Sequence, residues 1–316
     1  MHNRAPHTYV KSLYLLCVPR GDVFMEGLMK NPLTHEEQLT ALKSKGLIVE
    51  DENKCLEFLR SVNYYWFSAY FLPFKQSDGT YAQGLTFEKV HSIFEFDRKL
   101  RALIFFVIEE IELSMRSQLA YYFAHKHGTY AYLDKNLYNA GHDHKKFTST
   151  IKGAVHNHRN TPIVMHHNAK YGGKFPIWVI IDFFSLGNLS YFYADWDISD
   201  KKAFAKKMFG ATYPFLDSWM KCITVLRNRC AHYSRLYFSM FTDAPKVPRH
   251  IKYKSTGRLF DQLIMLQLLY TDKKRWNGVF LLPLKELLTE YSGSISLEHL
   301  GFPDNWQELI EHKIDD

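Results

Sequence analysis

The sequence predicts an all-α protein, a bundle of long helices with additional helices at its N- and C-terminal ends. Apolar residues recur every three or four positions from Thr86 to about Lys126, which is the pattern of a long amphipathic helix. No stretch alternates apolar and polar residues strongly enough to indicate a β-sheet. The 316 residues can bury a large core, either as one domain with appendages or as two small domains.

The first 28 residues do not share the helical pattern of the rest of the chain. They lack an amphipathic period and contain Arg-Gly and Pro breaks. The codons of Met25, Glu26 and Gly27 can contain GGAGG, a ribosome-binding sequence, shortly before the codon of Met29. We therefore expect residues 1–28 to be a non-native leader. A disordered N-terminal arm is the alternative.

Residues 29–85 are predicted to form an N-terminal helical segment. A first helix over 34–46 is expected to open with a capping box, because Glu37 follows a threonine at the required spacing. A second helix is expected over about 51–62. The aromatic block 64–74 is interpreted as part of the hydrophobic core.

Residues 86–250 are predicted to form the helical core, and residues 251–316 to form C-terminal helices packed on it. Gly128 is expected to end the long helix. A polar, basic, His-rich insert follows over 133–173. The remaining elements are predicted as an apolar stretch over 175–193 with a break at Gly187-Asn188, a basic helix over 200–208, a helix over 214–237, and two C-terminal helices near 257–270 and 278–291.

The composition favours a polyanionic partner. The net charge is +7 at pH 7 and the isoelectric point is near 9, and nucleic acid is the commonest polyanion in a cell. Many soluble proteins this basic bind no nucleic acid, so charge alone leaves that alternative open. The few cysteines, the absence of a signal peptide and the lack of an apolar run that could span a membrane predict a cytoplasmic protein without membrane association.

One short segment combines residues that can transfer protons and bind phosphate: Arg227-Asn228-Arg229-Cys230-Ala231-His232. Histidine exchanges protons near neutral pH, and arginine can stabilise a pentacovalent phosphorane with several N–H donors. In an ideal helix, Asn228 and His232 share a face and Arg227 flanks them. The alternative is a helix end where arginine caps carbonyl groups and the histidine is an ordinary surface residue. A Cys230–His232 nucleophile pair is also conceivable.

Several strings of this sequence resemble one family when taken in order. The R-N-x-x-x-H string resembles the signature of the HEPN superfamily, and the others resemble its abortive-infection (Abi) branch, from Met29 to the end of the chain. Asp182, where we expect glutamate, and Tyr237-Phe238 depart from the pattern. The supporting strings are Leu33-Thr-His-Glu-Glu-Gln-Leu39, Asn63-Tyr-Tyr-Trp66, Phe96-Asp-Arg-Lys-Leu-Arg101, Ile111-Glu-Leu-Ser-Met-Arg116, Pro176-Ile-Trp178, Leu186-Gly-Asn-Leu-Ser190 and Gly301-Phe-Pro-Asp-Asn-Trp306.

The resemblance implies a HEPN-like helical bundle and a metal-independent endoribonuclease in phage defence, acting as a toxin without a cofactor. Arg227, Asn228 and His232 are its expected catalytic residues. The resemblance also implies a homodimer in which two motifs share one cleft, and it leaves room for an antitoxin partner. Glu112 and Arg116, four residues apart, read physically as a helix ion pair, and the resemblance places them beside the cleft as supporting residues.

Two other functions are compatible with the sequence. One is a non-catalytic RNA-binding or sensor module, associated with a small structured noncoding RNA. The other is a protein-interaction bundle with no RNA role. RNA that co-purifies with the protein would exclude the protein-interaction bundle but not the RNA-binding module, and incubation with cellular RNA tests for cleavage.

The insert offers candidate RNA contacts. Its histidines lack an accompanying set of carboxylates or cysteines at a convincing spacing, so no metal site is expected. Lys145, Lys146 and Arg159 are the candidate RNA-binding residues of the insert. Lys201 and Lys202 are a second candidate set, for which a solvent-exposed helix face is the alternative.

Overall fold

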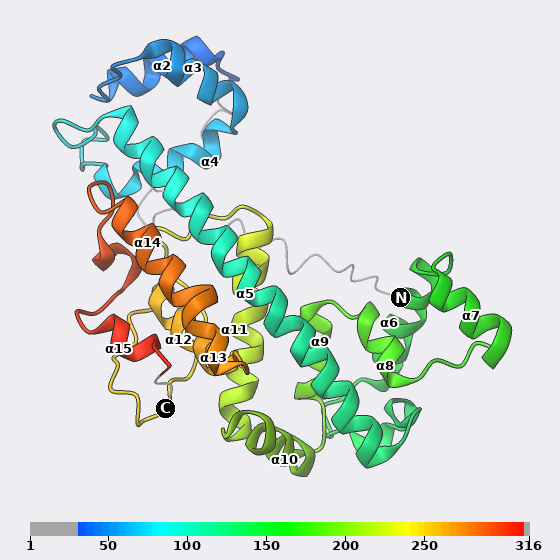
Figure 1. Cartoon of the computed structure of the whole chain (residues 1–316). Coiled ribbons are helices and arrows are strands. Elements are labelled where there is room, and N and C mark those ends of the chain that lie inside the picture. Colours follow the sequence, from blue (N-terminus) through cyan, green and yellow to red (C-terminus); the bar gives the residue numbers. More distant parts are fainter. Residues whose placement is uncertain (1–30, 313–316) are drawn as a thin grey trace. The chain divides into compact units, whose positions relative to one another are not determined.

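The computed structural model describes residues 31–312, and over this range the chain is helical without any β-strand (Figure 1). This confirms the predicted all-α fold class. The chain divides into two compact units, with the boundary between Phe94 and Glu95. The predicted leader, residues 1–28, lies outside the described residues. No helix in the described part of the chain is long and apolar enough to cross a membrane.

The first unit begins with helices whose ends follow from local sequence. The Thr34 hydroxyl accepts a hydrogen bond from Glu37 N at 3.1 Å, and the Glu37 carboxylate accepts one from Thr34 N at 2.7 Å. This confirms the predicted capping box. Gly46, with a φ of 91°, provides the left-handed turn after the first helix. The helices of this unit are α2 (His35–Ser44), α3 (Glu52–Ser61), α4 (Tyr64–Ser68), the 3₁₀ helix η2 (Ala69–Phe74) and the start of α5 (Phe87–His127).

Aromatic rings form the core of the first unit. The ring of Phe58 lies 4.8 Å from that of Phe67 and 5.2 Å from that of Phe94, in edge-to-face geometry. The aromatic block therefore contributes to the core as predicted. Tyr65 and Trp66, however, are 65% and 45% exposed, because a short helix can turn only one face inward.

Helix α5 is the longest element, with 41 residues, and it ends at Gly128 as predicted. Five apolar side chains between residues 100 and 111 are buried at the expected helical spacing, whereas Phe105 and Phe106 lie on the exposed face: the buried ones are Leu100, Ile104, Val107, Ile108 and Ile111. The periodic pattern in the sequence therefore identified both the helix and its buried face.

The motif helix α11 (Tyr213–Ala231) is central to the second unit. It packs against α9 (Leu186–Ala194), α10 (Ile198–Phe209) and α12 (Leu259–Leu269). Figure 1 shows α11, in yellow-green, between α9 and α12. Its buried side chains include two large ones, Trp219 and Met220, so a single helix connects the core of this unit to the candidate motif at its C-terminal end.

The predicted break at Gly187-Asn188 is wrong. The hydroxyl of Ser185 accepts a hydrogen bond from Asn188 N at 3.1 Å and caps α9, so both residues lie in its first turn. A Cβ atom at Gly187 would lie 3.7 Å from the methyl group of Thr224 on α11. This is an ordinary van der Waals distance, so residue 187 lies where α9 packs against α11 and does not interrupt α9.

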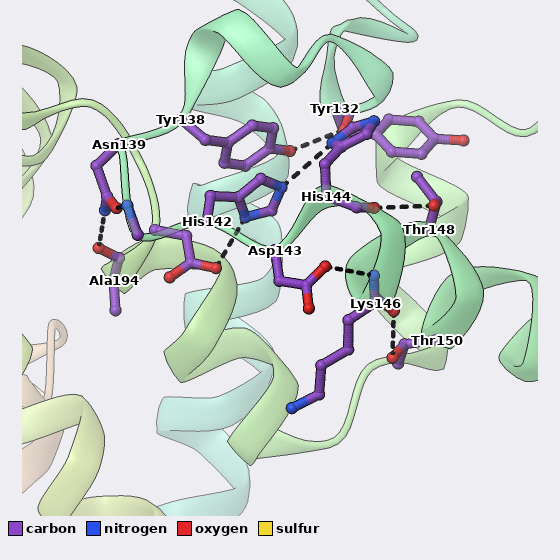
Figure 2. Close-up of polar contacts among 12 residues, drawn as sticks. Tyr132, Tyr138, Asn139, His142, Asp143, His144, Lys146, Thr148, Thr150 and Ala194 are labelled. Atoms are coloured by element: carbon purple, nitrogen blue, oxygen red, sulfur yellow. Dashed lines mark hydrogen bonds and ion pairs between the residues drawn. The ribbon is translucent and has the colours of Figure 1, made fainter. Parts of the chain in front are cut away.

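The His-rich insert is helical and tied to the core by hydrogen bonds. Its helices are α6 (His144–Asn157) and α7 (Pro162–Tyr171), and the short α8 (Ile177–Ile180) follows them. The Asn139 amide donates to the Ala194 carbonyl at 3.0 Å, and the His142 ring lies 2.9 Å from the Asp195 carboxylate. Figure 2 shows these insert residues converging beside the tyrosine pair Tyr132 and Tyr138.

The C-terminal helices differ in extent from the prediction. Near 278–291 the sequence predicted one helix, but helical structure begins at α13 (Lys273–Trp276) and continues through a π-helical turn (Asn277–Leu281) into α14 (Leu282–Glu290). A further helix, α15 (Trp306–Ile310), was not predicted. The buried indole of Trp276 donates to the Ile310 carbonyl at 2.6 Å, which holds the short helix in place.

Candidate functional site

The motif helix ends at Ala231, and His232 is its C-terminal cap. The predicted extension to Tyr237 is wrong, because Tyr233 has a left-handed backbone conformation with a φ of 56°. Tyr233 N donates to the Cys230 carbonyl at 3.2 Å, and Ser234 N donates to the Arg229 carbonyl at 2.9 Å. This is the hydrogen-bond pattern of a Schellman motif, with tyrosine at the position where glycine is usual.

The carboxylate of Asp97 holds the segment that follows. Asp97, on α5, is fully buried and accepts hydrogen bonds from the backbone amides of Leu236 at 3.1 Å and Tyr237 at 2.8 Å. Arg101, one turn further along α5, forms an ion pair with the same carboxylate. This contact anchors the chain a few residues after His232.

Asn228 contacts both of its motif partners. The backbone carbonyl of Asn228 accepts a hydrogen bond from His232 N at 3.0 Å. Its side-chain oxygen accepts one from a terminal guanidinium nitrogen of Arg227 at 3.4 Å. The imidazole of His232 is exposed and makes no hydrogen bond within the described chain. The amide therefore orients the arginine, weakly, while the histidine faces solvent.

Arg227 lines a pocket of about 250 Å³ together with Glu112 and Arg116 from α5. The pocket therefore brings one predicted catalytic residue together with both predicted supporting residues. His232 does not line it. The remaining walls are formed by Phe105, Ile108, Glu109 and Leu113.

The ion pair between Glu112 and Arg116 is present, and both side chains are more than four-fifths buried. Arg116 also donates to the Ile181 carbonyl at 2.6 Å. Its guanidinium is thus held from two sides at the edge of the pocket, and a partly buried charge held in this way has little orientational freedom.

The two arginines of the motif have different surroundings. Arg229 is buried, donates to the Met240 carbonyl at 3.0 Å and lies over the ring of Phe241. Arg227, by contrast, forms no ion pair among the described residues, and its Nε–H is buried without an acceptor. A buried donor without a partner is unfavourable by roughly 1–3 kcal/mol, so Arg227 is the arginine with donor capacity left for a ligand.

A cysteine nucleophile does not fit the site. Burial raises the pKa of the Cys230 thiol to about 12, and burial likewise raises the pKa of Cys222 to about 12. A thiol with such a pKa stays protonated at neutral pH and is a poor nucleophile. Cys230 is therefore a packing residue of α11.

The structure alters the predicted basic surfaces. Lys145, Lys146, Arg159 and Lys202 are exposed. Lys201 does not belong to an exposed patch: it is 7% exposed, and its ammonium donates to the Asp217 carboxylate at 2.8 Å and to the Ala194 carbonyl at 3.1 Å. Its long side chain reaches inward because a partly buried carboxylate and a helix-end carbonyl both accept its hydrogen bonds.

The insert histidines participate in a hydrogen-bond network. His142 is stacked on Tyr138 with ring centres 3.9 Å apart, and it lies within 3.2 Å of His144 (Figure 2). Between residues 31 and 312, no group of three or more His, Cys, Asp or Glu side chains has the arrangement of a metal site.

Sequence analysis did not predict three features of the site. The role of Asp97 was not foreseen, although its string carried the family resemblance. The conformation of Tyr233 has no sequence signal, since tyrosine seldom occupies the left-handed region. The apolar pocket walls Phe105 and Leu113 could have been found, because each lies four residues from Glu109 on the same helix face.

Residues 57–238 match the family described as Abi-like protein, which is more than half of the chain. The chain belongs to this family. The matched region of this Abi-like protein includes Asp97, the ion pair of α5 and the whole Arg227–His232 motif. Membership indicates a function related to abortive infection. No curated protein and no solved structure matches the chain.

Replacing Asp97 with alanine should lower the free energy of unfolding by about 3–5 kcal/mol, because the amides of Leu236 and Tyr237 and the guanidinium of Arg101 all lose a buried acceptor. Glu95→Ala is the matched control, since it removes an ion pair with Arg98 at the surface of the same helix. That variant should lose about 1 kcal/mol or less. Urea unfolding of both proteins measures the difference, and equal losses would contradict the anchoring role of Asp97.

Replacing Tyr233 with glycine should stabilise the protein by roughly 1 kcal/mol, because a left-handed conformation is unfavourable for residues with a Cβ atom. The tyrosine side chain is 73% exposed, so its removal sacrifices little packing. Tyr121→Gly, at a similarly exposed tyrosine inside α5, should instead destabilise the protein by about 1 kcal/mol. Thermal unfolding that shows a loss of stability in both variants would refute the strain at Tyr233.

Proposed function

We propose that this Abi-like chain is a metal-independent endoribonuclease of the HEPN type that acts in abortive-infection phage defence. The observation that carries the proposal is the state of Arg227. Its guanidinium lies in a pocket and retains unused donors, one turn before the exposed imidazole of His232. A phosphate of RNA satisfies such donors, because guanidinium groups bind phosphate oxygens in a bidentate manner.

The proposed reaction is an internal transesterification. His232 accepts the proton of a ribose 2′-hydroxyl or donates one to the leaving 5′-oxygen. Arg227 stabilises the charge that develops on the phosphorane, and Asn228 orients Arg227 through its side-chain oxygen. Arg116, held by Glu112, adds a second positive charge at the pocket. The products are a 2′,3′-cyclic phosphate and a 5′-hydroxyl, and DNA is not cleaved because it lacks the 2′-hydroxyl.

A second copy of the chain completes the proposed site. One histidine cannot readily act as both base and acid in a single step, and His232 does not line the pocket of its own chain. Around this pocket α5 exposes Phe105, Phe106 and Leu113, at 37%, 46% and 60%. Apolar side chains exposed side by side are typical of an interaction surface. We place the homodimer contact here, next to the motif helix.

A non-catalytic RNA-binding or sensor module is the second candidate. The observation that favours it is the separation of His232 from the pocket that Arg227 lines. In this case the exposed cations of the insert hold an RNA, such as a small structured noncoding RNA, without cleaving it.

His232→Ala and Arg227→Ala should each reduce cleavage of total cellular RNA by at least about a hundredfold, since a general acid or base contributes that much or more. Both variants should remain folded, because His232 is exposed and Arg227 lies at a pocket. His250→Ala, at another exposed histidine, is the control and should keep full activity. Gel analysis with and without EDTA measures cleavage. Full activity in either motif variant, or loss of activity with EDTA, would rule out the mechanism.

Leu113→Glu should convert the protein from a dimer to a monomer and abolish cleavage, because a charge at the centre of an apolar contact is desolvated on association. Light scattering after size-exclusion chromatography gives the mass. Tyr121→Glu, a similarly exposed position further along α5, should leave both the mass and the activity unchanged. A wild-type protein that is monomeric at active concentrations would contradict the shared site.

A further inference from the structure

The insert contains a second pocket, of about 640 Å³, that shares no residue with the pocket of Arg227. It lies between α6, α7 and the segment that leads into α8. Small-molecule sites in proteins usually have volumes of roughly 300–1,000 Å³, so this pocket is large enough for a compact organic ligand.

The floor of the pocket is apolar and held by hydrogen bonds. Its buried side chains are those of Ile151, Val164, Phe175 and Ile180. The hydroxyl of Tyr132, also a lining residue, donates to the Phe175 carbonyl at 2.7 Å. Burial raises the pKa of this hydroxyl to about 12, so it stays a donor at neutral pH.

The hydrogen bonds of the insert extend this support. The hydroxyl of Tyr138 donates to the Tyr132 carbonyl at 2.8 Å, and the two tyrosines lie beside His142 and His144 (Figure 2). Because the histidine next to Tyr138 is also bonded to Asp195, the pocket floor is connected to the core of the second unit. The floor is therefore formed before any ligand binds, which lowers the entropic cost of binding.

The rim of the pocket is basic. Lys152, Arg159 and Lys174 are exposed there, and none of them forms an ion pair within residues 31–312. No carboxylate is among the lining residues. The side-chain amide of Asn168 also lines the pocket and makes no hydrogen bond in the described structure, so it can both donate and accept.

We propose that this pocket binds a nucleoside phosphate. A flat heterocyclic base occupies the apolar floor, Asn168 hydrogen-bonds its edge, and the phosphate lies among the three cations of the rim. An uncharged apolar ligand would leave these cations unused, and inorganic phosphate would leave the floor empty. The nucleoside phosphate is either a free mononucleotide or an unpaired nucleotide of a bound RNA, since both present the same chemical groups.

Binding to the full-length protein tests the proposal. Calorimetric titrations use AMP, GMP, CMP and UMP, with adenosine and inorganic phosphate as references. A second series uses a short single-stranded 2′-O-methyl RNA, which cannot undergo transesterification. Arg159→Ala removes a rim cation, and Val155→Phe fills the pocket from α6 without changing charge. Lys206→Ala is the control, because this exposed lysine lies on α10, outside the insert, and does not line the pocket.

The expected result is binding of at least one mononucleotide, or of the RNA, that both pocket variants weaken by roughly tenfold or more and the control leaves unchanged. Binding of a mononucleotide identifies a free nucleotide as a ligand, and binding of the RNA alone identifies an unpaired nucleotide. Three results would overturn the proposal: no binding of either probe, equal losses in Arg159→Ala and Lys206→Ala, or no effect of Val155→Phe.

Discussion

The position of the candidate site depends on the buried carboxylate of Asp97. It accepts two backbone hydrogen bonds from Leu236 and Tyr237 and is paired with Arg101. Because these amides follow His232 closely, the contact determines where the chain leaves α11 and thus where the imidazole can lie. A buried charge needs such partners, since a lone carboxylate in the core is strongly unfavourable. The interaction therefore links the first half of α5 to the end of the motif helix.

The same region combines strain with unused hydrogen-bonding capacity. Tyr233 occupies a left-handed conformation beside His232, and Arg227 keeps a buried N–H without an acceptor. Features of this kind cluster at functional sites, where a ligand provides the missing partner. The neighbouring guanidinium of Arg116 is held rigidly by contrast. Under the proposed function, an RNA phosphate accepts hydrogen bonds from Arg227, which has an unused donor, beside the positive charge of Arg116, which is already held in place. Such a pair of guanidinium groups suits a tetrahedral anion.

Local patterns in the sequence were sufficient for the long helix α5, the capping box at Thr34 and the ion pair of Glu112 with Arg116, since each depends on residues one to four positions apart. The features that were missed depend on distant residues. The segment that follows α11 is held by an aspartate 139 residues before Leu236. Lys201 belongs to a run of charges, which predicts exposure, but Asp217 draws it into the interior.

Analysis of the ends of cleaved RNA tests the account most directly, because the chemistry of the products reports the reaction itself. The purified protein is incubated with RNA in the presence of EDTA, and the new termini are identified by mass spectrometry. The account predicts 2′,3′-cyclic phosphate and 5′-hydroxyl ends, formed at the same rate with and without the chelator. Products with 5′-phosphate ends, or no cleavage once divalent metal is removed, would contradict it.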